Sequence, residues 1–462
     1  MNTKQIAIKI ILLIALAFGL GLLCNSIGLT PHQSLSVSIF FISILGTMLF
    51  WDFRLAFAFI GSSALLITKT IDLENFILSA SLEVILFLVG MMVLIGLLKE
   101  AGVFAWIITL ILRIRNLTGK RFTVILSVVS ALLACAVDEV TSIVFMVAAI
   151  LEICDYFEVN PIPFIIMSVL STNIGSAGTV LGNPIGILIA SKAGLTFEDF
   201  MVKAFPIMIL CLLVTIGMFL YIFRRDIKNL DKQMKELGAN DMLIRLISVP
   251  PDRTLKHALC IFGTTIVFIA LHHRLELALG LEANTILVVA PLIFAGIVMV
   301  WKHNRARSYI EKDVEWWTLL FFLLLFAQAG TLRFTGATLV FANKIAAFAG
   351  NQENFLTTLV LWVSTIGSSI LDNVVLVAAF IPVIQSFQNI HTDALWWALL
   401  FGGCLGGNIT IIGSTANIVA VGILEKERGL RISFLHWLGV GLLVGIVTVS
   451  IVMACLFFLP NY

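Results

Sequence analysis

The feature that most constrains this chain is a series of apolar segments, each long enough to cross a lipid bilayer. About 20 apolar residues span the hydrocarbon core as one helix, and such segments recur from residue 6 to residue 458. Hydrophobic residues make up 60% of the 462 residues and charged residues only 12%, against roughly 25% charged in a soluble domain. The sequence therefore predicts an all-α polytopic membrane protein.

Four of the apolar runs are about 32 residues long, which is too long for one straight span. They carry polar or glycine-rich centres that read ACAVDEVTS, STNIGSAGTVLGNP, SSILDNVV and GGNITIIGSTAN. Unpaired backbone inside hydrocarbon is tolerated only where protein or water covers it. We therefore predict re-entrant hairpins at 122–153 and 354–386, and broken helices that cross the bilayer at 161–192 and 394–424.

The polar centres of the first half recur in the second half at a nearly constant offset. Asp138 matches Asp372 at an offset of 234, and Gly182 matches Gly413 at an offset of 231. A shared register over a long stretch indicates an internal duplication. In transporters such duplicates often have inverted topology, with the binding site at their interface.

The duplication divides the chain into four parts. A first transmembrane helix and outer loop at 1–34 precede a first inverted repeat at 35–223. The only long polar stretch, 224–255, is predicted to be a cytoplasmic linker, and 256–462 is the second repeat.

The positive charges set the orientation. If both hairpins return to the side from which they enter, most of the 29 Lys and Arg residues lie inside, in agreement with the positive-inside bias. This arrangement gives about 11 transmembrane helices in a plasma or inner membrane, with the N-terminus cytoplasmic and the C-terminus outside. We expect 103–118 and 337–352 to be interfacial helices, and the Trp residues near segment ends, Trp437 among them, to form an interfacial belt.

Three carboxylates lie in the middle of apolar runs, namely Asp138, Glu139 and Asp372. Each would cost about 2.5–3.5 kcal/mol if it were charged at the bilayer centre. We interpret them as a site for a coupling ion, either a proton or sodium, and the alternative is that one or more only cap a half-helix. The other candidate ion- or substrate-binding residues are Thr141, Asn173, Gly175, Thr179, Gly182, Asn183, Asn373, Asn408, Thr410, Gly413, Ser414 and Asn417.

A candidate sodium site combines Asp138, Asn173, Asp372 and Asn408. Asn173 and Asn408 are themselves a matched pair, at an offset of 235. Amide and carboxylate oxygens at helix breaks are typical ligands of a transported cation.

Other classes of protein are disfavoured. The seven cysteines lack metal-ligand spacing, and no stretch forms a sustained basic face, so we expect no cofactor and no nucleic-acid partner. No nucleophile–base pair or phosphate-cradling loop indicates an enzyme. A passive channel would need a continuous polar path, whereas the polar residues here are confined to the breaks.

These motifs resemble a known superfamily. LEVILFLVGMMVLIGLLKEAGVF, AVDEVTS and STNIGSAGTVLGNP resemble the first half, and LWWALLFGGCLGGNITIIGSTANIVAVGILE the second half, of the ion-transporter superfamily. That group includes arsenite pump membrane subunits, NhaD-type sodium/proton antiporters, the P protein, citrate-transporter-like proteins and divalent-anion/sodium symporters. The resemblance covers nearly the whole chain after residue 35 and implies inverted repeats, a scaffold that forms a homodimer, and elevator-like movement of a transport domain.

Two departures from the family pattern fall at the expected coupling site. The hairpin tips of the family carry an Asp-Asn or Ser-Asn pair, which Asp372-Asn373 matches, but the first tip has Glu139 in place of Asn. The first broken helix has Ile185-Gly186 where the family pattern continues Pro-Asn. Both departures favour a protonatable first site.

The resulting hypothesis is a secondary active transporter coupled to protons or sodium. Cation/proton antiport is slightly favoured, and an anion, arsenite or carboxylate permease is the alternative. The four motifs contain no central Arg or Lys, which argues against a citrate-like trianion. An ATPase subunit, as arsenite pumps recruit, is left open.

The orientation is testable with single cysteines introduced at Asp231 and Lys344. Position 231 lies in the predicted cytoplasmic linker and position 344 in an outer interfacial helix. A membrane-impermeant maleimide added to intact cells should label position 344 at once and position 231 only after permeabilisation. Labelling of both from the same side would contradict the predicted hairpins.

Overall fold

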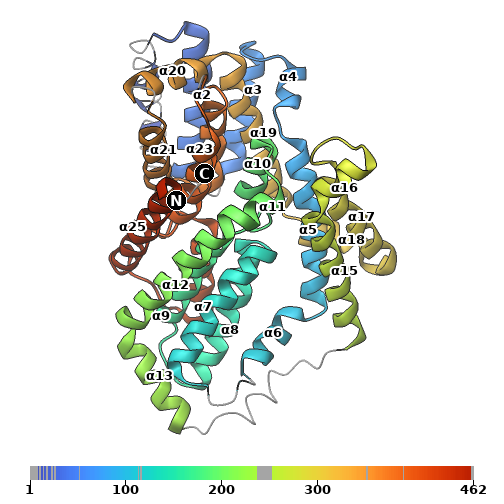
Figure 1. Cartoon of the computed structure of the whole chain (residues 1–462), viewed down its shortest axis with the longest axis vertical. Helices are drawn as coiled ribbons and strands as arrows, with labels where there is room; N and C mark the ends of the chain where they lie inside the picture. Colours follow the sequence, from blue (N-terminus) through green and yellow to red (C-terminus); the bar gives the residue numbers. More distant parts are fainter. Residues whose placement is uncertain are drawn as a thin grey trace. The chain divides into compact units, whose positions relative to one another are not determined.

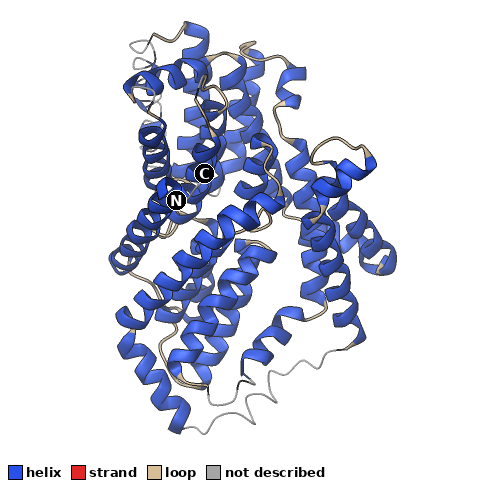
Figure 2. Ribbon diagram, in the orientation of Figure 1, coloured by secondary structure: helices blue, strands red, loops and turns tan. Residues whose placement is uncertain are grey.

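The computed structural model describes residues 28–50, 53–112, 114, 117–236, 252–349, 352–388 and 390–458, with a few residues between 9 and 24. Within these ranges every regular element is a helix and none is a strand (Figure 2). The all-α prediction is confirmed. The predicted first span at 6–23 lies largely outside the described residues.

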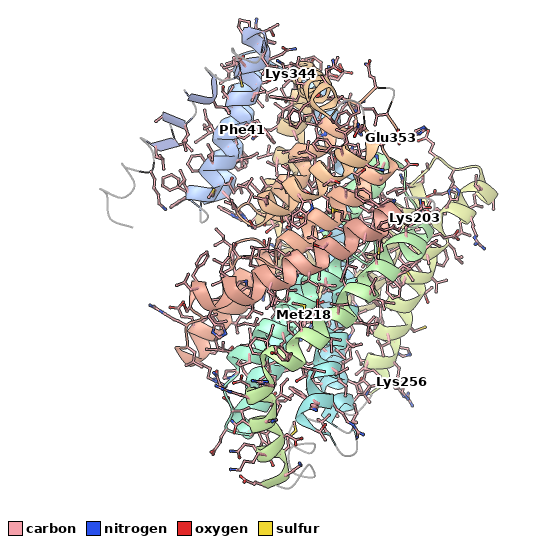
Figure 3. All side chains as sticks on the ribbon, turned by 60° about the vertical axis from the view of Figure 1, so that its left-hand side comes forward. Phe41, Lys203, Met218, Lys256, Lys344 and Glu353 are labelled. Atoms are coloured by element: carbon pink, nitrogen blue, oxygen red, sulfur yellow. The ribbon has the colours of Figure 1, made fainter. Side chains whose placement is uncertain are left out.

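Seven helices in the described part of the chain are long and apolar enough to cross a membrane. They are α2 (Pro31–Leu49), α5 (Leu82–Glu100), α7 (Gly119–Ala136), the continuous helix Phe197–Ile222 that ends in α12 (Phe205–Ile222), α15 (Arg253–Ala270), α19 (Trp316–Phe334) and α25 (Phe434–Phe458). An eighth span is formed if α17 (Thr285–Trp301) is counted with His303–Asp313, to which it is bent by 103°. Figure 3 places Lys203 at the upper end of the helix Phe197–Ile222 and Met218 further along it. The predicted number of about 11 transmembrane helices remains a prediction.

The polar centres interrupt the helices as expected. α7 ends at Ala136 and α8 (Glu139–Tyr156) begins two residues after Val137. α9 (Ile162–Ser176) is separated from α10 (Pro184–Ala193), α21 (Glu353–Ser368) from α22 (Asn373–Ile384), and α23 (Asp393–Gly406) from α24 (Thr415–Arg428). α7 and α8 pack side by side, as a hairpin requires (Figure 1).

The chain folds into two compact units. Unit 1 contains 1–85, 315–359 and 374–396, and unit 2 contains 86–314, 360–373 and 397–462. Each unit therefore takes segments from both predicted repeats. The repeat boundaries at 35–223 and 256–462 remain a prediction about sequence duplication, and they do not coincide with the compact units.

Unit 1 is built around α19, which packs against α2, α3 (Arg54–Ile67), α4 (Leu73–Leu78) and α20 (Ala337–Phe348). Its apolar core contains Ile39, Leu65, Ile71, Phe76, Ala80 and Ala327. Gln328 of α19 is fully buried and donates from Nε2 to the carbonyl of Ala58 (2.8 Å) and to Ser62 Oγ (3.0 Å). A polar tie of this kind fixes the helix register where apolar packing alone is permissive.

Unit 2 is a bundle in which α7 packs against both α8 and α9, while α24 packs against α8 and α9. α12 contacts α7, α9 and α25, so it joins the first hairpin to the C-terminal helix (Figure 1). All residues of the candidate site belong to this unit.

Glycines in left-handed conformation occur at matched positions in the two halves of the sequence. Gly102 (φ 73°) and Gly336 (φ 76°) immediately precede α6 (Val103–Leu112) and α20. Gly194 (φ 69°) and Gly429 (φ 66°) end α10 and α24. Because residues with a Cβ atom adopt this region at a steric cost, glycine is favoured at each of these turns. At 10 and 12 residues, α6 and α20 are helical as expected and too short to span the bilayer.

The predicted linker begins with a helix that is packed on the first hairpin. α13 (Arg224–Glu236) buries Ile227, Leu230 and Met234 and contacts α7. Asp231 accepts from the backbone N–H of Gly119 (3.1 Å) and forms an ion pair with Lys235 (3.0 Å). Lys235 and this N–H hold the pKa of Asp231 below its usual value. Residues 237–251 lie outside the described residues.

Close packing of α9 on α7 depends on Gly175, where an added Cβ would lie 2.7 Å from the carbonyl carbon of Ala131. We expect Gly175→Ala to reduce the free energy of unfolding by about 1–3 kcal/mol, because the two backbones must separate. Thermal unfolding in detergent measures this change. Gly217→Ala on α12 is the matched control, since no atom lies within 4 Å of its Cβ position. Equal melting temperatures for both variants would contradict the packing argument.

Candidate coupling site at the helix breaks

The site is formed where helix N-termini meet in unit 2. Asp138 caps α8 by accepting from the N–H of Thr141 (2.8 Å), and Ser414 caps α24 by accepting from Ala416 (3.2 Å). α22 begins at Asn373. Helix N-termini carry a partial positive charge and unpaired N–H groups. Such ends stabilise negative charge without a cationic side chain.

Glu139 is the first residue of α8 and is only 4% exposed. Its Oε1 accepts from Asn373 Nδ2 (3.2 Å) and from Ser414 Oγ (3.4 Å). No Lys or Arg in the described part of the chain forms an ion pair with it. A buried carboxylate is costly unless it is paired, protonated or bound to a cation.

The neighbouring ionisable groups are also acids. Asp372 is 8% exposed and accepts from Thr415 Oγ1 (2.9 Å). Asp138 directly precedes Glu139 in the chain, and Asp372 directly precedes Asn373, which donates to Glu139. Like charges in one region cannot all remain ionised without a counter-charge. The geometry therefore favours uptake of one positive charge.

Three asparagines form a buried amide network beside these acids. Asn173 Nδ2 donates to Asn408 Oδ1 and to Asn417 Oδ1, both at 2.9 Å. Ser414 Oγ donates to Asn173 Oδ1 at 3.2 Å. All three amides are at most 1% exposed. The network fixes the side-chain orientation of each asparagine.

Ser414 links the acid cluster to the amide network. Its hydroxyl reaches both Glu139 Oε1 (3.4 Å) and Asn173 Oδ1 (3.2 Å). A hydroxyl has a single proton to donate. Ser414 can therefore donate a full hydrogen bond to only one of these two oxygens at a time. The charge on Glu139 determines which oxygen is the stronger acceptor.

Equivalent contacts join each broken helix to the hairpin of its own half. Thr179 Oγ1 donates to the carbonyl of Cys135, and Thr410 Oγ1 donates to the carbonyl of Ser369, both at 2.5 Å. The donors are separated by 231 residues and the acceptors by 234, which are the offsets of the sequence repeat. The hydroxyls satisfy carbonyls at the hairpin tips that no helix can pair.

Glycines permit the close approaches at the same offsets. Gly182 packs against the Ser176 carbonyl, and Gly413 against the Gly407 carbonyl. Gly175 and Gly406 meet the backbones of α7 and α21, at Ala131 and Thr365 respectively. These glycines are matched at an offset of 231 residues. At that offset Asn173 corresponds to Cys404, four residues before Asn408, and not to Asn408 as the sequence comparison had paired it.

Hydrogen bonds join part of the predicted set in one network, which contains Glu139, Asn173, Asn373, Asn408, Thr410, Ser414 and Asn417. Asn417 Nδ2 donates to the carbonyls of Gly407 (2.7 Å) and Thr410 (2.8 Å). Within the candidate sodium set, Asn173 and Asn408 are directly bonded. Asp138 accepts a hydrogen bond from the backbone N–H of Thr141, and Asp372 accepts one from the hydroxyl of Thr415.

Ser176, Cys404 and Thr415 contact the site but were not among the predicted site residues, whereas Asn183 was. Asn183 Nδ2 donates to Ser176 Oγ (3.0 Å) and to Cys404 Sγ (3.1 Å), while its Oδ1 caps α10. Ser176, Cys404 and Thr415 are adjacent in sequence to predicted residues or motifs, which is the only signal that could have indicated them. Trp437 is fully buried and donates to the carbonyl of Asn408 (3.1 Å). The interfacial-belt interpretation was wrong for Trp437, because its indole N–H pairs a carbonyl inside the protein.

A multi-span helical fold with buried polar residues at helix breaks is characteristic of membrane transporters. The chain belongs to the citrate transporter family, whose sequence model matches residues 44–402. The match extends over both hairpins and most of the helix breaks.

Known proteins agree with this class. The uncharacterized transporter Rv2684 of Mycobacterium tuberculosis is 31% identical over 82% of this chain and 86% of its own length. The human P protein is 25% identical over 81% of this chain and 53% of its own length. The structure is similar to the YdaH transporter of Alcanivorax borkumensis, with a TM-score of 0.54, 15% identity, and coverage of 85% of this chain and 87% of that one. The last comparison supports the fold alone.

The charges of the site can be tested with isosteric variants. Asp138→Asn and Asp372→Asn keep an oxygen that accepts from Thr141 or Thr415 but remove the negative charge. We expect each variant to abolish flux while expression and membrane insertion are retained, because the site can no longer hold its counter-charge. Radiotracer uptake into vesicles, normalised to transporter content, measures the effect. Full activity in either variant would show that its carboxylate only caps a helix.

Proposed function

We propose that this protein is a secondary active transporter in which Glu139 carries the coupling proton. The observation that supports the proposal is that a buried carboxylate accepts from neutral side chains, among them Asn373 and Ser414. In the hydrocarbon region such a group is stable when it is protonated or bound to a cation. Alternation between the charged and neutral forms is what coupling requires.

The shared hydroxyl of Ser414 provides the link between protonation and the rest of the site. When Glu139 is ionised it is the stronger acceptor, and the Ser414 proton is directed to it. When Glu139 is protonated, the hydroxyl is directed to Asn173 Oδ1. The amide network therefore changes its hydrogen bonding with each proton that enters or leaves.

Sodium is the second candidate for the coupling ion. Hard cations prefer oxygen ligands, and oxygen atoms of Glu139, Ser414 and Asn173 meet here. For either ion we propose cation/proton antiport as the leading mode. The cluster of Asp138, Glu139 and Asp372 supports this choice, because a transported cation and protons would compete for the same carboxylates.

Transport of a carboxylate or another oxyanion is the alternative, and a specific observation favours it. Asn408 Nδ2 is buried and has no hydrogen-bond partner within the described residues. An oxygen of an anionic substrate would satisfy it, with helix N-termini adding favourable partial charge. The name of the citrate transporter family agrees with this alternative. In this mode the carboxylates would bind the coupling ion.

We also propose that the protein forms a homodimer in the plasma or inner membrane, with the N-terminus in the cytoplasm. The supporting features are the distribution of Lys and Arg along the sequence and the positive-inside bias. The resemblance to elevator-type transporters supports the dimer.

The proposal is tested in proteoliposomes that hold a preset pH gradient reported by an internal dye. Sodium, lithium, citrate or arsenite is added separately. Collapse of the gradient by sodium or lithium alone would support antiport, and a response only to an anion would support the alternative. A gradient that is insensitive to all four would contradict proton coupling to these ions.

Glu139→Gln then identifies the residue that carries the proton. We expect ion-driven proton movement to be lost, because the amide keeps a side-chain oxygen for Asn373 and Ser414 but cannot be ionised. Glu152→Gln, on the same helix α8 but exposed, is the matched control and should retain wild-type proton movement. Proton movement that survives in Glu139→Gln would assign the coupling to another group.

A further inference from the structure

The carbonyl of Asn408 belongs to a break, and a helix outside the break satisfies it. Asn408 lies two residues after the end of α23 and before the start of α24, so its carbonyl belongs to neither helix and needs a partner from elsewhere. The indole N–H of Trp437, on α25, donates to it at 3.1 Å. Trp437 is fully buried. Trp437 therefore contributes a hydrogen bond to the helix break in addition to its apolar packing.

The face of α25 that carries Trp437 also carries glycines, which allow it to pack closely against the break. Gly441 lies one turn after Trp437, and an added Cβ there would lie 2.9 Å from the carbonyl oxygen of Ile409 and would also meet the carbonyl of Asn408. Gly445 follows after another turn, where a Cβ would lie 2.7 Å from Ile409 Cγ1. Residues four apart share one helix face. This face of α25 is therefore in contact with the backbone of residues 408 and 409.

The side chain of Asn408 has a separate hydrogen-bond partner. Its Oδ1 accepts from Asn173 Nδ2 at 2.9 Å, and this orientation leaves Asn408 Nδ2 buried without a hydrogen-bond partner in the described structure. An unpaired buried amide is unfavourable. The orientation must consequently be held by the surrounding contacts, and the bond from Trp437 to the main chain of the same residue is one of them.

We propose that Trp437 is a positioning residue for the coupling site. By holding the carbonyl of Asn408, Trp437 keeps Asn408 Oδ1 where Asn173 binds it, and Asn173 in turn accepts from Ser414, the hydroxyl that contacts Glu139. Trp437 acts on the bound ion only through this chain of hydrogen bonds. The inference rests on the proposed function for its effect on transport, but not for its effect on the break.

The test compares Trp437→Phe with Trp397→Phe. Phenylalanine keeps an aromatic ring and removes only the N–H and part of the ring. Trp397 is the matched control, because it is also fully buried in unit 2 and its Nε1 has no hydrogen-bond partner within the described residues. Both variants lose the same group, and only Trp437→Phe loses a hydrogen bond.

Two measurements are made on each variant. Hydrogen–deuterium exchange of peptides covering 406–417 reports the break directly, and we expect faster exchange in Trp437→Phe but not in Trp397→Phe. Flux driven by sodium, and separately by citrate, reports the site. We expect Trp437→Phe to raise the half-saturating concentration of the active ion by about tenfold, with the maximal rate retained within about twofold.

Gly441→Ala and Gly439→Ala are a second pair in case Trp437→Phe does not fold. Gly441→Ala pushes α25 away from the break and should reproduce both effects, whereas Gly439 has open space at its Cβ position and should be unaffected.

The outcomes are distinct. Unchanged exchange in both Trp437→Phe and Gly441→Ala would overturn the proposal, and so would faster exchange with an unchanged half-saturating concentration, since Trp437 would then be structural only. If the wild-type protein moves no ion, the proposed function fails, while the exchange data still decide whether Trp437 holds the break.

Discussion

Backbone groups that a helix break exposes inside hydrocarbon must be paired by the protein, and this constraint explains several of the buried polar residues in unit 2. Thr179 and Thr410 pair the carbonyls of Cys135 and Ser369 at the hairpin tips. Asn417 pairs two carbonyls of the second break. These polar side chains within apolar runs therefore have a structural role, which is to pair the backbone at the breaks.

The same breaks also determine the electrostatic environment of the acids near them. Each break starts a new helix whose N-terminus carries partial positive charge, and at α8 the N–H of Thr141 donates to Asp138. No fixed cation of the described residues neutralises Glu139. A salt bridge would hold the carboxylate permanently in its charged form, whereas neutral donors allow a proton or another cation to bind and leave.

Much of this could be predicted from the sequence. Polar residues within long apolar runs indicated the breaks at 177–183 and 407–414, because their cost in a membrane limits them to covered positions. The contacts among them could not be predicted, since Asn183 meets Cys404 across 221 residues. The interleaving of both halves in each unit was missed for the same reason, as sequential repeats suggest sequential domains. Trp437 was misinterpreted because a tryptophan near the end of an apolar run has the same sequence pattern at a membrane surface and in a protein interior.

The long separation between Glu139 and its donors has a consequence for biosynthesis. Asn373 follows Glu139 by 234 residues and Ser414 follows it by 275. At a synthesis rate of about 5–20 residues per second, the first hairpin waits roughly 10–60 s before these donors are made. During that interval the carboxylate must be neutralised by a proton, remain in contact with water, or be sheltered by the insertion machinery. The first hairpin of the nascent chain therefore reaches its final burial only after the second half of the protein has entered the membrane.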